Sequence, residues 1–118
     1  MIIKFIFSTR EGWQVLTANE AYATYGRKGY HNLPLFKADG KNIFELRGSE
    51  YEVLRECASE EEAQKTLAQW VSDDDDNVVV YETFADAEKS IREAYDGEPG
   101  LEELMADLCR AVAVGALK

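Results

Sequence analysis

The sequence predicts an α+β fold, in which a mostly antiparallel sheet of about five or six strands is packed by two or three C-terminal helices. Two patterns support this prediction. Residues 1–57 alternate short apolar runs with turn residues, which is typical of an antiparallel meander. From residue 58 onward, apolar residues recur at helical spacing. The 118 residues fit one domain, with a strand-rich part at 1–57 and a helix-rich part at 58–118.

The first elements are a strand pair and a short helix. Strong β formers in residues 2–7 predict a strand, although Lys4 interrupts its apolar run. A turn follows, and residues 13–17 predict a second strand, antiparallel to the first. Asn19 is the expected N-cap of a short helix that ends at Gly26.

Two more turns continue the strand-rich part. Residues 26–32 have the composition of a loop. A hairpin is expected over residues 35–47, because Asp39 and Gly40 form a turn between two apolar runs. Gly48 and Ser49 make another tight turn before a strand at 51–57. The N-terminal half therefore reads as a meander.

Helical periodicity begins at Ser59, the expected N-cap of the next helix. Glu62 stands at the capping-box position behind it, and the apolar face of this helix extends to Val71. Residues 78–84 form a short apolar strand, which we expect to be reached from the preceding strand by a right-handed crossover. Residues 85–95 predict another helix.

Pro99 opens the last predicted helix, which carries a continuous apolar stripe. The stripe follows the spacing of one helical face and consists of Leu101, Leu104, Met105, Leu108 and Val112. Such a stripe either docks on the body of the chain or pairs with a second copy. Docking is the first expectation, and a homodimer through these five residues is the alternative.

Charge is the main functional clue. The net charge of −10 disfavours direct binding to nucleic acid or to anionic membranes. Residues 1–47 hold seven Lys and Arg against four Asp and Glu, a balance of +3. The rest of the chain holds six against nineteen, a balance of −13. General adaptation to high salt would make both parts acidic. The difference in charge between the two parts therefore indicates that the acidic surface has a functional role.

An acidic surface of this kind is suited to a basic protein partner. We expect a small non-enzymatic regulator or inhibitor whose carboxylates dock on a basic protein, for example a nucleic-acid-binding protein whose groove accepts phosphates. The protein would then mimic the phosphates of DNA. The expected partner-binding residues are Glu60, Glu61, Glu62, Asp73, Asp74, Asp75, Asp76, Asp86 and Glu88.

The sequence contains no recognisable catalytic, metal or cofactor constellation, and we expect no enzyme activity, cofactor or metal. His31 is the only histidine, and no GxSxG elbow or phosphate-binding glycine loop occurs. The run Asp73–Asp76 lacks the central glycine and the distal glutamate of a calcium loop. The two cysteines form no CxxC pair. Without an apolar run of membrane-spanning length or a signal peptide, a cytoplasmic location is the default.

An alternative function is an RNA- or nucleotide-binding module that uses loop 22–31. This loop is the one basic and aromatic cluster in the sequence. Its tyrosines could stack on bases and its cations could contact phosphates. The residues expected to bind the ligand are Tyr25, Arg27, Lys28, Tyr30 and His31.

Overall fold

The computed structural model describes residues 2–115, so both ends of the predicted 1–118 domain lie outside the described residues. Within this range the chain has six strands and four α-helices. The strands are β1 (Lys4–Thr9), β2 (Gly12–Thr17), β3 (Phe36–Asp39), β4 (Asn42–Arg47), β5 (Glu50–Glu56) and β6 (Val79–Tyr81). The helices are α1 (Ala18–Tyr25), α2 (Glu60–Asp74), α3 (Phe84–Ala94) and α4 (Leu101–Gly115). The predicted α+β class is confirmed.

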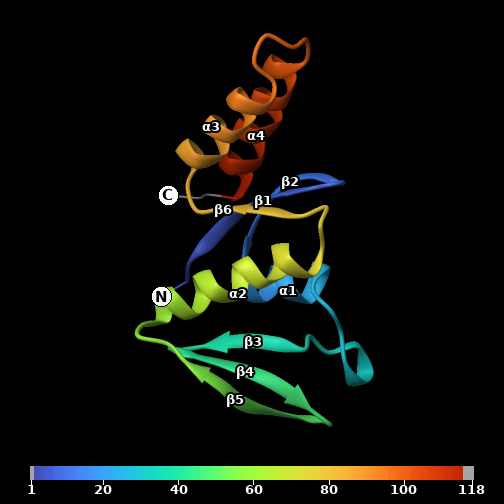
Figure 1. Cartoon of the computed structure of the whole chain (residues 1–118), viewed down its shortest axis with the longest axis vertical. Helices are drawn as coiled ribbons and strands as arrows, with labels where there is room; N and C mark the ends of the chain where they lie inside the picture. The colour runs from blue at the N-terminus through green and yellow to red at the C-terminus, as the bar shows by residue number, and fades with distance from the viewer. Residues whose placement is uncertain (1, 116–118) are drawn as a thin grey trace.

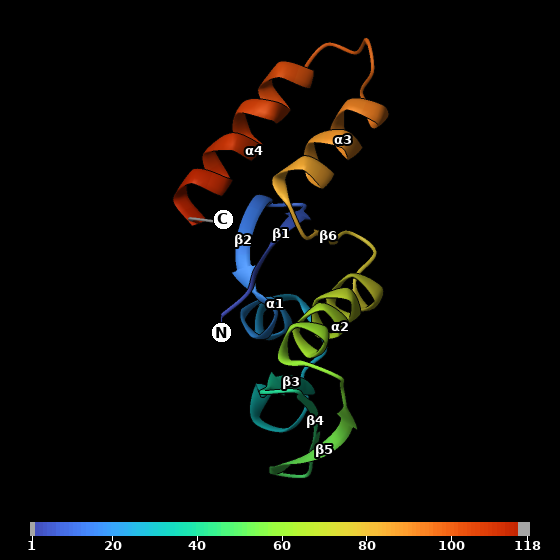
Figure 2. The same ribbon diagram turned by 90° about the vertical axis from the view of Figure 1, so that its left-hand side faces the viewer.

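The strands form two three-stranded antiparallel sheets, ordered β2-β1-β6 and β3-β4-β5, where the sequence predicted one sheet. Figure 1 shows four stacked layers: the α3–α4 hairpin, the sheet β2-β1-β6, the helices α1 and α2, and the sheet β3-β4-β5. The molecule is elongated, with principal extents of 49 × 27 × 22 Å. The view turned by 90° shows the same order of layers (Figure 2).

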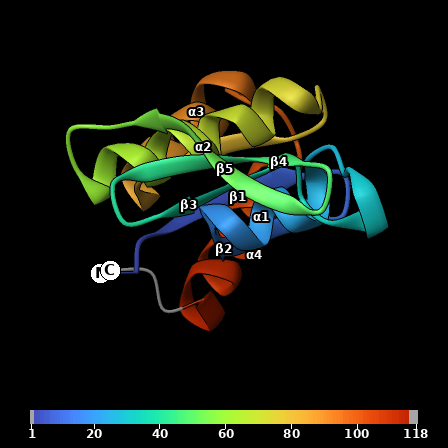
Figure 3. The ribbon, with the colours of Figure 1, turned by 90° about the horizontal axis from the view of Figure 1, so that it is seen from below.

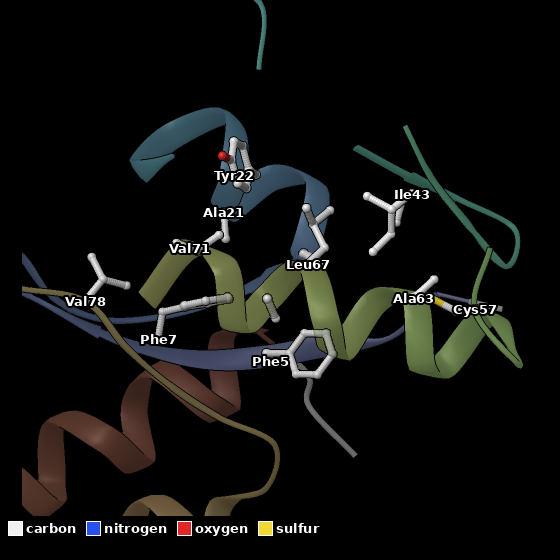
Figure 4. Close-up of a cluster of buried hydrophobic side chains, with 13 residues drawn as sticks. Phe5, Phe7, Ala21, Tyr22, Ile43, Cys57, Ala63, Leu67, Val71 and Val78 are labelled. Atoms are coloured by element: carbon white, nitrogen blue, oxygen red, sulfur yellow. The ribbon is translucent and has the colours of Figure 1, made fainter. Parts of the chain in front are cut away.

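Strand β1 contributes side chains to two hydrophobic clusters, one on each face of its sheet. Phe5 and Phe7 point to one face and pack with α1 and α2, as Figure 4 shows for both phenylalanines. Ile6 points to the other face and packs with α3 and α4. Alternation along a strand sends successive side chains to opposite faces, so one apolar run supplies both clusters. The continuous apolar run at residues 5–7 thus reflects a strand buried on both faces.

Lys4, which interrupts the apolar run in the sequence, has a structural partner at the far end of the chain. Its ammonium donates a hydrogen bond to the carbonyl of Gly115, at 3.2 Å. Gly115 is the last residue of α4. A cation at the C-terminal end of a helix complements the helix dipole and satisfies a terminal carbonyl. Lys4 therefore attaches the C-terminal end of α4 to the start of β1.

Asn19 does not cap α1 as the sequence predicted. Thr17 is the N-cap, and its hydroxyl accepts a hydrogen bond from the backbone of Glu20. The Asn19 amide instead forms a pair of 2.8 Å hydrogen bonds with the backbone N–H and C=O of Ala38 in β3. The side chain thus occupies the free edge of β3 in the way that a neighbouring strand does. Sequence alone does not distinguish these two uses of an asparagine near a helix start.

The predicted parallel crossover between the strand at 51–57 and the strand at 78–84 is wrong. Strand β5 belongs to one sheet, and β6 pairs antiparallel with β1 in the other. Strand β6 is also shorter than expected, because Phe84 begins α3 behind the N-cap Thr83. The predicted cap of α2 is confirmed: the Ser59 hydroxyl accepts from the Glu62 N–H, and the Glu62 carboxylate accepts from the Ala58 N–H.

Candidate functional site in the acidic helices and the tyrosine loop

The four aspartates 73–76 lie at the C-terminal end of α2. Asp73 and Asp74 are its last two residues, and Asp75 is its C-cap. The helix dipole presents partial negative charge at this end, so carboxylates here are destabilising unless they find partners. No basic residue lies in the last turn of α2. The compensation must therefore come from elsewhere in the chain.

Asp74 receives that compensation from α1 and the loop behind it. The Tyr22 hydroxyl donates to Asp74 Oδ2 at 2.7 Å, and Arg27 Nε lies 3.3 Å from Oδ1. The Asp74 side chain is only 16% exposed, whereas that of Arg27 is 72% exposed. Burial is the main cause that raises the pKa of Tyr22, and the hydrogen bond to Asp74 adds to it. Asp74 is thus a structural contact, and it also neutralises Arg27 of the alternative site.

The other three aspartates differ in their hydrogen bonds and in their exposure to solvent. Asp75 Oδ1 accepts from the backbone and side chain of Asn77, which closes a turn. Asp73 accepts from Gln69 on the preceding turn of the helix and stays exposed. Asp76 is exposed. Two of the four carboxylates, those of Asp73 and Asp76, therefore face solvent, and within residues 2–115 neither has an ion-pair partner. Among residues 2–115, no group of three or more His, Cys, Asp or Glu is placed to hold a metal ion.

The three glutamates at the start of α2 also have local roles. They lie in its first turn, where the helix dipole favours negative charge. Glu62 completes the cap, and Glu61 lies 3.6 Å from Lys65. Lys65 also contacts Glu82, at 3.2 Å, and this contact is the main cause that raises the pKa of the Lys65 ammonium. Glu60 accepts a hydrogen bond from Gln64. Much of this cluster is therefore compensated within the chain.

On α3, Glu88 pairs with Arg92 one turn later, while Asp86 is exposed in the first turn. The nine predicted partner-binding residues do not gather in one place. They lie at both ends of α2, which is about 22 Å long at 1.5 Å per residue, and on α3. Few of them offer a free carboxylate.

The largest group of free carboxylates lies at the tip of the α3–α4 hairpin, which the sequence did not single out. Between residues 93 and 109 there are six acidic residues and no Lys or Arg. All six are exposed, and within residues 2–115 four of them have no ion-pair partner. We call this group the acidic tip, and it consists of Asp96, Glu98, Glu102 and Glu103. It lies at the end of the molecule farthest from sheet β3-β4-β5 (Figure 1).

The acidic tip has a defined local structure. Gly97 and Gly100 adopt positive φ angles of 71° and 98°, which turn the chain from α3 into α4. Glu102 and Glu103 lie in the first turn of α4, where the dipole favours them. Charge balance over a segment, rather than consecutive acids, was the signal in the sequence that could have located this group.

The tyrosine loop of the alternative site is only partly free. Arg27 is paired with Asp74, but Lys28 and Tyr30 are exposed, and the rings of Tyr30 and His31 lie 4.1 Å apart. His31 has a φ of 56° and its neighbour a φ of 62°, so two consecutive non-glycine residues are left-handed. Such strain persists only where surrounding structure enforces it. A bridge between Lys28 and residue 34 closes the base of this turn.

Tyr25 lies apart from the exposed ring pair. Its hydroxyl is buried and has no hydrogen-bond partner within residues 2–115. Tyr25 lines a pocket of about 270 Å³ together with Arg10, Thr24 and Asp75. The five predicted ligand-binding residues therefore divide into an exposed ring pair with Lys28, a neutralised Arg27 and a largely buried Tyr25.

The apolar stripe of α4 packs within the chain. Leu108 is fully buried against Ile6, and the other four residues of the stripe pack around it. This arrangement agrees with docking as the first expectation. Self-association through Leu101, Leu104, Met105, Leu108 and Val112 stays a prediction, and it would have to compete with these intramolecular contacts.

Comparison with known proteins gives no relative: no family model, curated protein or solved structure matches the chain. Among residues 2–115, no helix combines the length and apolar character needed to cross a membrane.

Proposed function

We propose that this protein is a small non-enzymatic regulator that docks on a basic protein through the acidic tip. The observation that carries the proposal is that four exposed carboxylates at one end of an elongated molecule have no ion-pair partner among residues 2–115. By contrast, Asp74, Glu61, Glu62 and Glu88 are engaged within the chain. We therefore propose that docking takes place through the α3–α4 hairpin rather than through α2.

Physical chemistry favours this end of the molecule for recognition. Free carboxylates gain most from a cationic partner, because no internal ion pair has to be broken first. A projecting hairpin also enters a groove that a flat surface cannot. A basic groove built for phosphates is the best match for such a tip, so we propose that the protein competes there with nucleic acid. The excess negative charge accelerates the encounter in low salt.

The test compares two variants with equal charge change. The tip variant carries Asp96→Asn, Glu98→Gln, Glu102→Gln and Glu103→Gln. The control carries Glu11→Gln, Asp39→Asn, Asp73→Asn and Asp76→Asn, four exposed acids on the body of the molecule. Proteins captured from native cell extract at low salt are then compared among wild type, tip variant and control.

The expected result is that a captured basic protein is lost from the tip variant and retained by the control. Its association rate with wild type should fall steeply with salt, and the protein should compete with DNA or RNA for it. Equal capture by both variants would place docking elsewhere. Equal loss in both variants would mean that net charge alone, not a defined site, attracts the partner.

A second candidate function is binding of RNA or a nucleotide by the tyrosine loop. The observation that favours it is the exposed Tyr30–His31 ring pair held in a left-handed turn. The test is a titration of isotopically labelled protein with short single-stranded RNA at low salt, where phosphate contacts are strongest. Amide shifts confined to residues 26–33 are expected. Unchanged spectra would exclude this function.

A further inference from the structure

Strand β5 has an unpaired edge. It pairs with β4 on one side, and within residues 2–115 no strand lies on its other side. The opposite edge of the same sheet is different, because the Asn19 side chain pairs with the backbone of β3 there. Figure 3, seen from below, shows this sheet at the near end of the molecule, away from α3 and α4. The sheet therefore has one covered edge and one open edge.

The register identifies the backbone groups at the open edge. The Leu46 N–H donates to the Leu35 carbonyl, away from β5. Tyr51 lies opposite Leu46, so this is a pair without mutual hydrogen bonds, and the N–H and C=O of Tyr51 point outward. Val53, two residues later, points the same way. Two outward donors and two outward acceptors are thus available to another strand.

From Glu50 to Val53 the side chains of β5 alternate between the two faces of the sheet, and a register shift between Ile43 and Phe44 interrupts the pairing beyond Val53. Tyr51 and Val53 share a face with Leu46 and Phe44, their cross-strand partners. Lys37 covers part of this face, with its ammonium 4.2 Å from the centre of the Tyr51 ring. Val53 is nevertheless 57% exposed, in the middle of the strand. This face would accept apolar side chains from an added strand.

The other face of β5 carries two glutamates. Glu50 and Glu52 lie on it, opposite Arg47 and Glu45, and both glutamates are exposed. Arg47 Nε lies 3.5 Å from Glu52 Oε2 and 2.9 Å from Glu45 Oε1, so of these two glutamates of β5 only Glu50 has no ion-pair partner within residues 2–115. Pairing of β5 with β5 of a second copy would bring glutamates near glutamates, which is destabilising. Charges on an edge strand commonly prevent such self-pairing. The same charges admit a strand that carries cations at the matching positions.

We propose that the open edge of β5 binds an extended segment of a partner protein in which basic and apolar residues alternate. The segment would add a fourth strand to sheet β3-β4-β5. Its backbone would pair with Tyr51 and Val53, and its apolar side chains would cover Val53. One of its cations would meet Glu50, and a second would share Glu52 with Arg47. This site lies at the end of the molecule opposite the acidic tip, so it shares with the proposed function only the basic character of the partner, and each proposal can fail alone.

The test uses a blocked peptide of alternating lysine and valine as the probe, titrated into isotopically labelled protein. Two control peptides have the same length: one of the same composition with its lysines and valines in separate blocks, and one with glutamate in place of lysine. The expected result is binding of the alternating peptide only, with amide shifts in residues 50–56 and slower hydrogen exchange at Tyr51 and Val53.

Two variants with equal charge change locate the site. Glu50→Lys with Glu52→Lys should weaken binding by about tenfold or more, because two favourable exposed pairs become repulsive. Glu102→Lys with Glu103→Lys on the hairpin should change affinity by less than about threefold. Glu50→Gln with Glu52→Gln, a milder change at the same positions, should give an intermediate loss. Urea unfolding of each variant verifies that it is folded.

Several results would overturn the proposal. These are no binding of the alternating peptide, equal binding of the block-ordered peptide, or shifts centred on the acidic tip. Concentration-dependent dimerisation with exchange protection of β5 in the absence of peptide would assign the edge to a second copy instead. Loss of peptide binding with intact capture through the tip would leave the proposed function standing.

Discussion

Asp74 and Asp73 are neighbours in sequence, yet their removal should change stability in opposite directions. Asp74→Ala removes the acceptor of the Tyr22 hydroxyl and the partner of Arg27. Asp73→Asn removes an exposed charge at the unfavourable end of the α2 dipole and keeps an acceptor for Gln69. The pair therefore tests whether the aspartate run is partly structural.

The magnitudes follow from burial. A hydrogen bond to a charged group contributes about 1.5–3 kcal/mol. The ion pair to the largely exposed Arg27 contributes at most about 1 kcal/mol. Removing a carboxylate from the C-terminal end of a helix raises the free energy of unfolding by about 0.3–1 kcal/mol. Asp74→Ala should thus lower the free energy of unfolding by about 1–3 kcal/mol, whereas Asp73→Asn should raise it by about 0.3–1 kcal/mol.

Urea unfolding followed by tryptophan fluorescence measures both values. Trp70 packs against the cluster around Phe5 and Phe7, and Trp13 packs against the cluster around Ile6, so the two tryptophans report on both clusters. Combining Asp74→Ala with Tyr22→Phe completes a double-mutant cycle, which should show a positive interaction energy of about 1 kcal/mol or more. Shifts of equal sign for Asp73→Asn and Asp74→Ala, or a cycle that closes near zero, would refute the assignment of Asp74 as a structural contact.

Three further predictions concern other parts of the fold. Asn19→Ala should lower the free energy of unfolding by about 1–3 kcal/mol, because it leaves the backbone groups of Ala38 unpaired at the edge of β3; urea unfolding measures this, and a loss below about 0.5 kcal/mol would contradict it. Leu108→Ala should lower the free energy of unfolding by about 2–5 kcal/mol, because it leaves a cavity in the cluster around Ile6. Val114→Ala, at a side chain on the same helix that is 84% exposed, should change it by less than about 0.5 kcal/mol. Equal losses in thermal unfolding would show that α4 is not docked through Leu108. The pKa of Tyr22 is raised above its ordinary value of 10.0, so the folded state holds this proton more tightly than the unfolded chain does. The resulting contribution to stability is complete below about pH 10 and decreases as the pH rises above it. Urea unfolding between pH 8 and 11 should therefore show a smaller alkaline loss of stability for Tyr22→Phe than for wild type, and identical losses would contradict this.

Local patterns predicted the helices well because their causes are local. Ser59 and Glu62 cap α2 through contacts within four residues, and this arrangement can be read from the sequence. The stripe on α4 was located for the same reason, since helical spacing alone determines which residues share a face. Only the surface against which the stripe packs required the structure.

The arrangement of the strands could not be predicted in the same way, because strand partners are set by contacts distant in sequence. Residues 79–81 gave an apolar strand but no indication that they pair with β1 rather than with β5. The contacts of Asn19 and Asp74 join residues 19 and 52 positions apart. The sequence also drew attention to consecutive aspartates, although within residues 2–115 the largest group of carboxylates without ion-pair partners lies at the α3–α4 tip, where the acids are spaced apart.

The pairing of β1 with β6 has a consequence for synthesis of the chain on the ribosome. Sheet β3-β4-β5 is contiguous in sequence, from Phe36 to Glu56, so it can form as soon as this segment emerges. Strands β1 and β2 emerge earlier but wait for β6 at residues 79–81, and Ile6 waits for α4. The face of β1 that carries Ile6 is therefore made first and covered last. During that interval Ile6 is exposed, whereas Phe5 and Phe7 can already pack against α1 and α2. A nascent chain stalled before residue 79 should therefore be a better chaperone substrate than one stalled after residue 115.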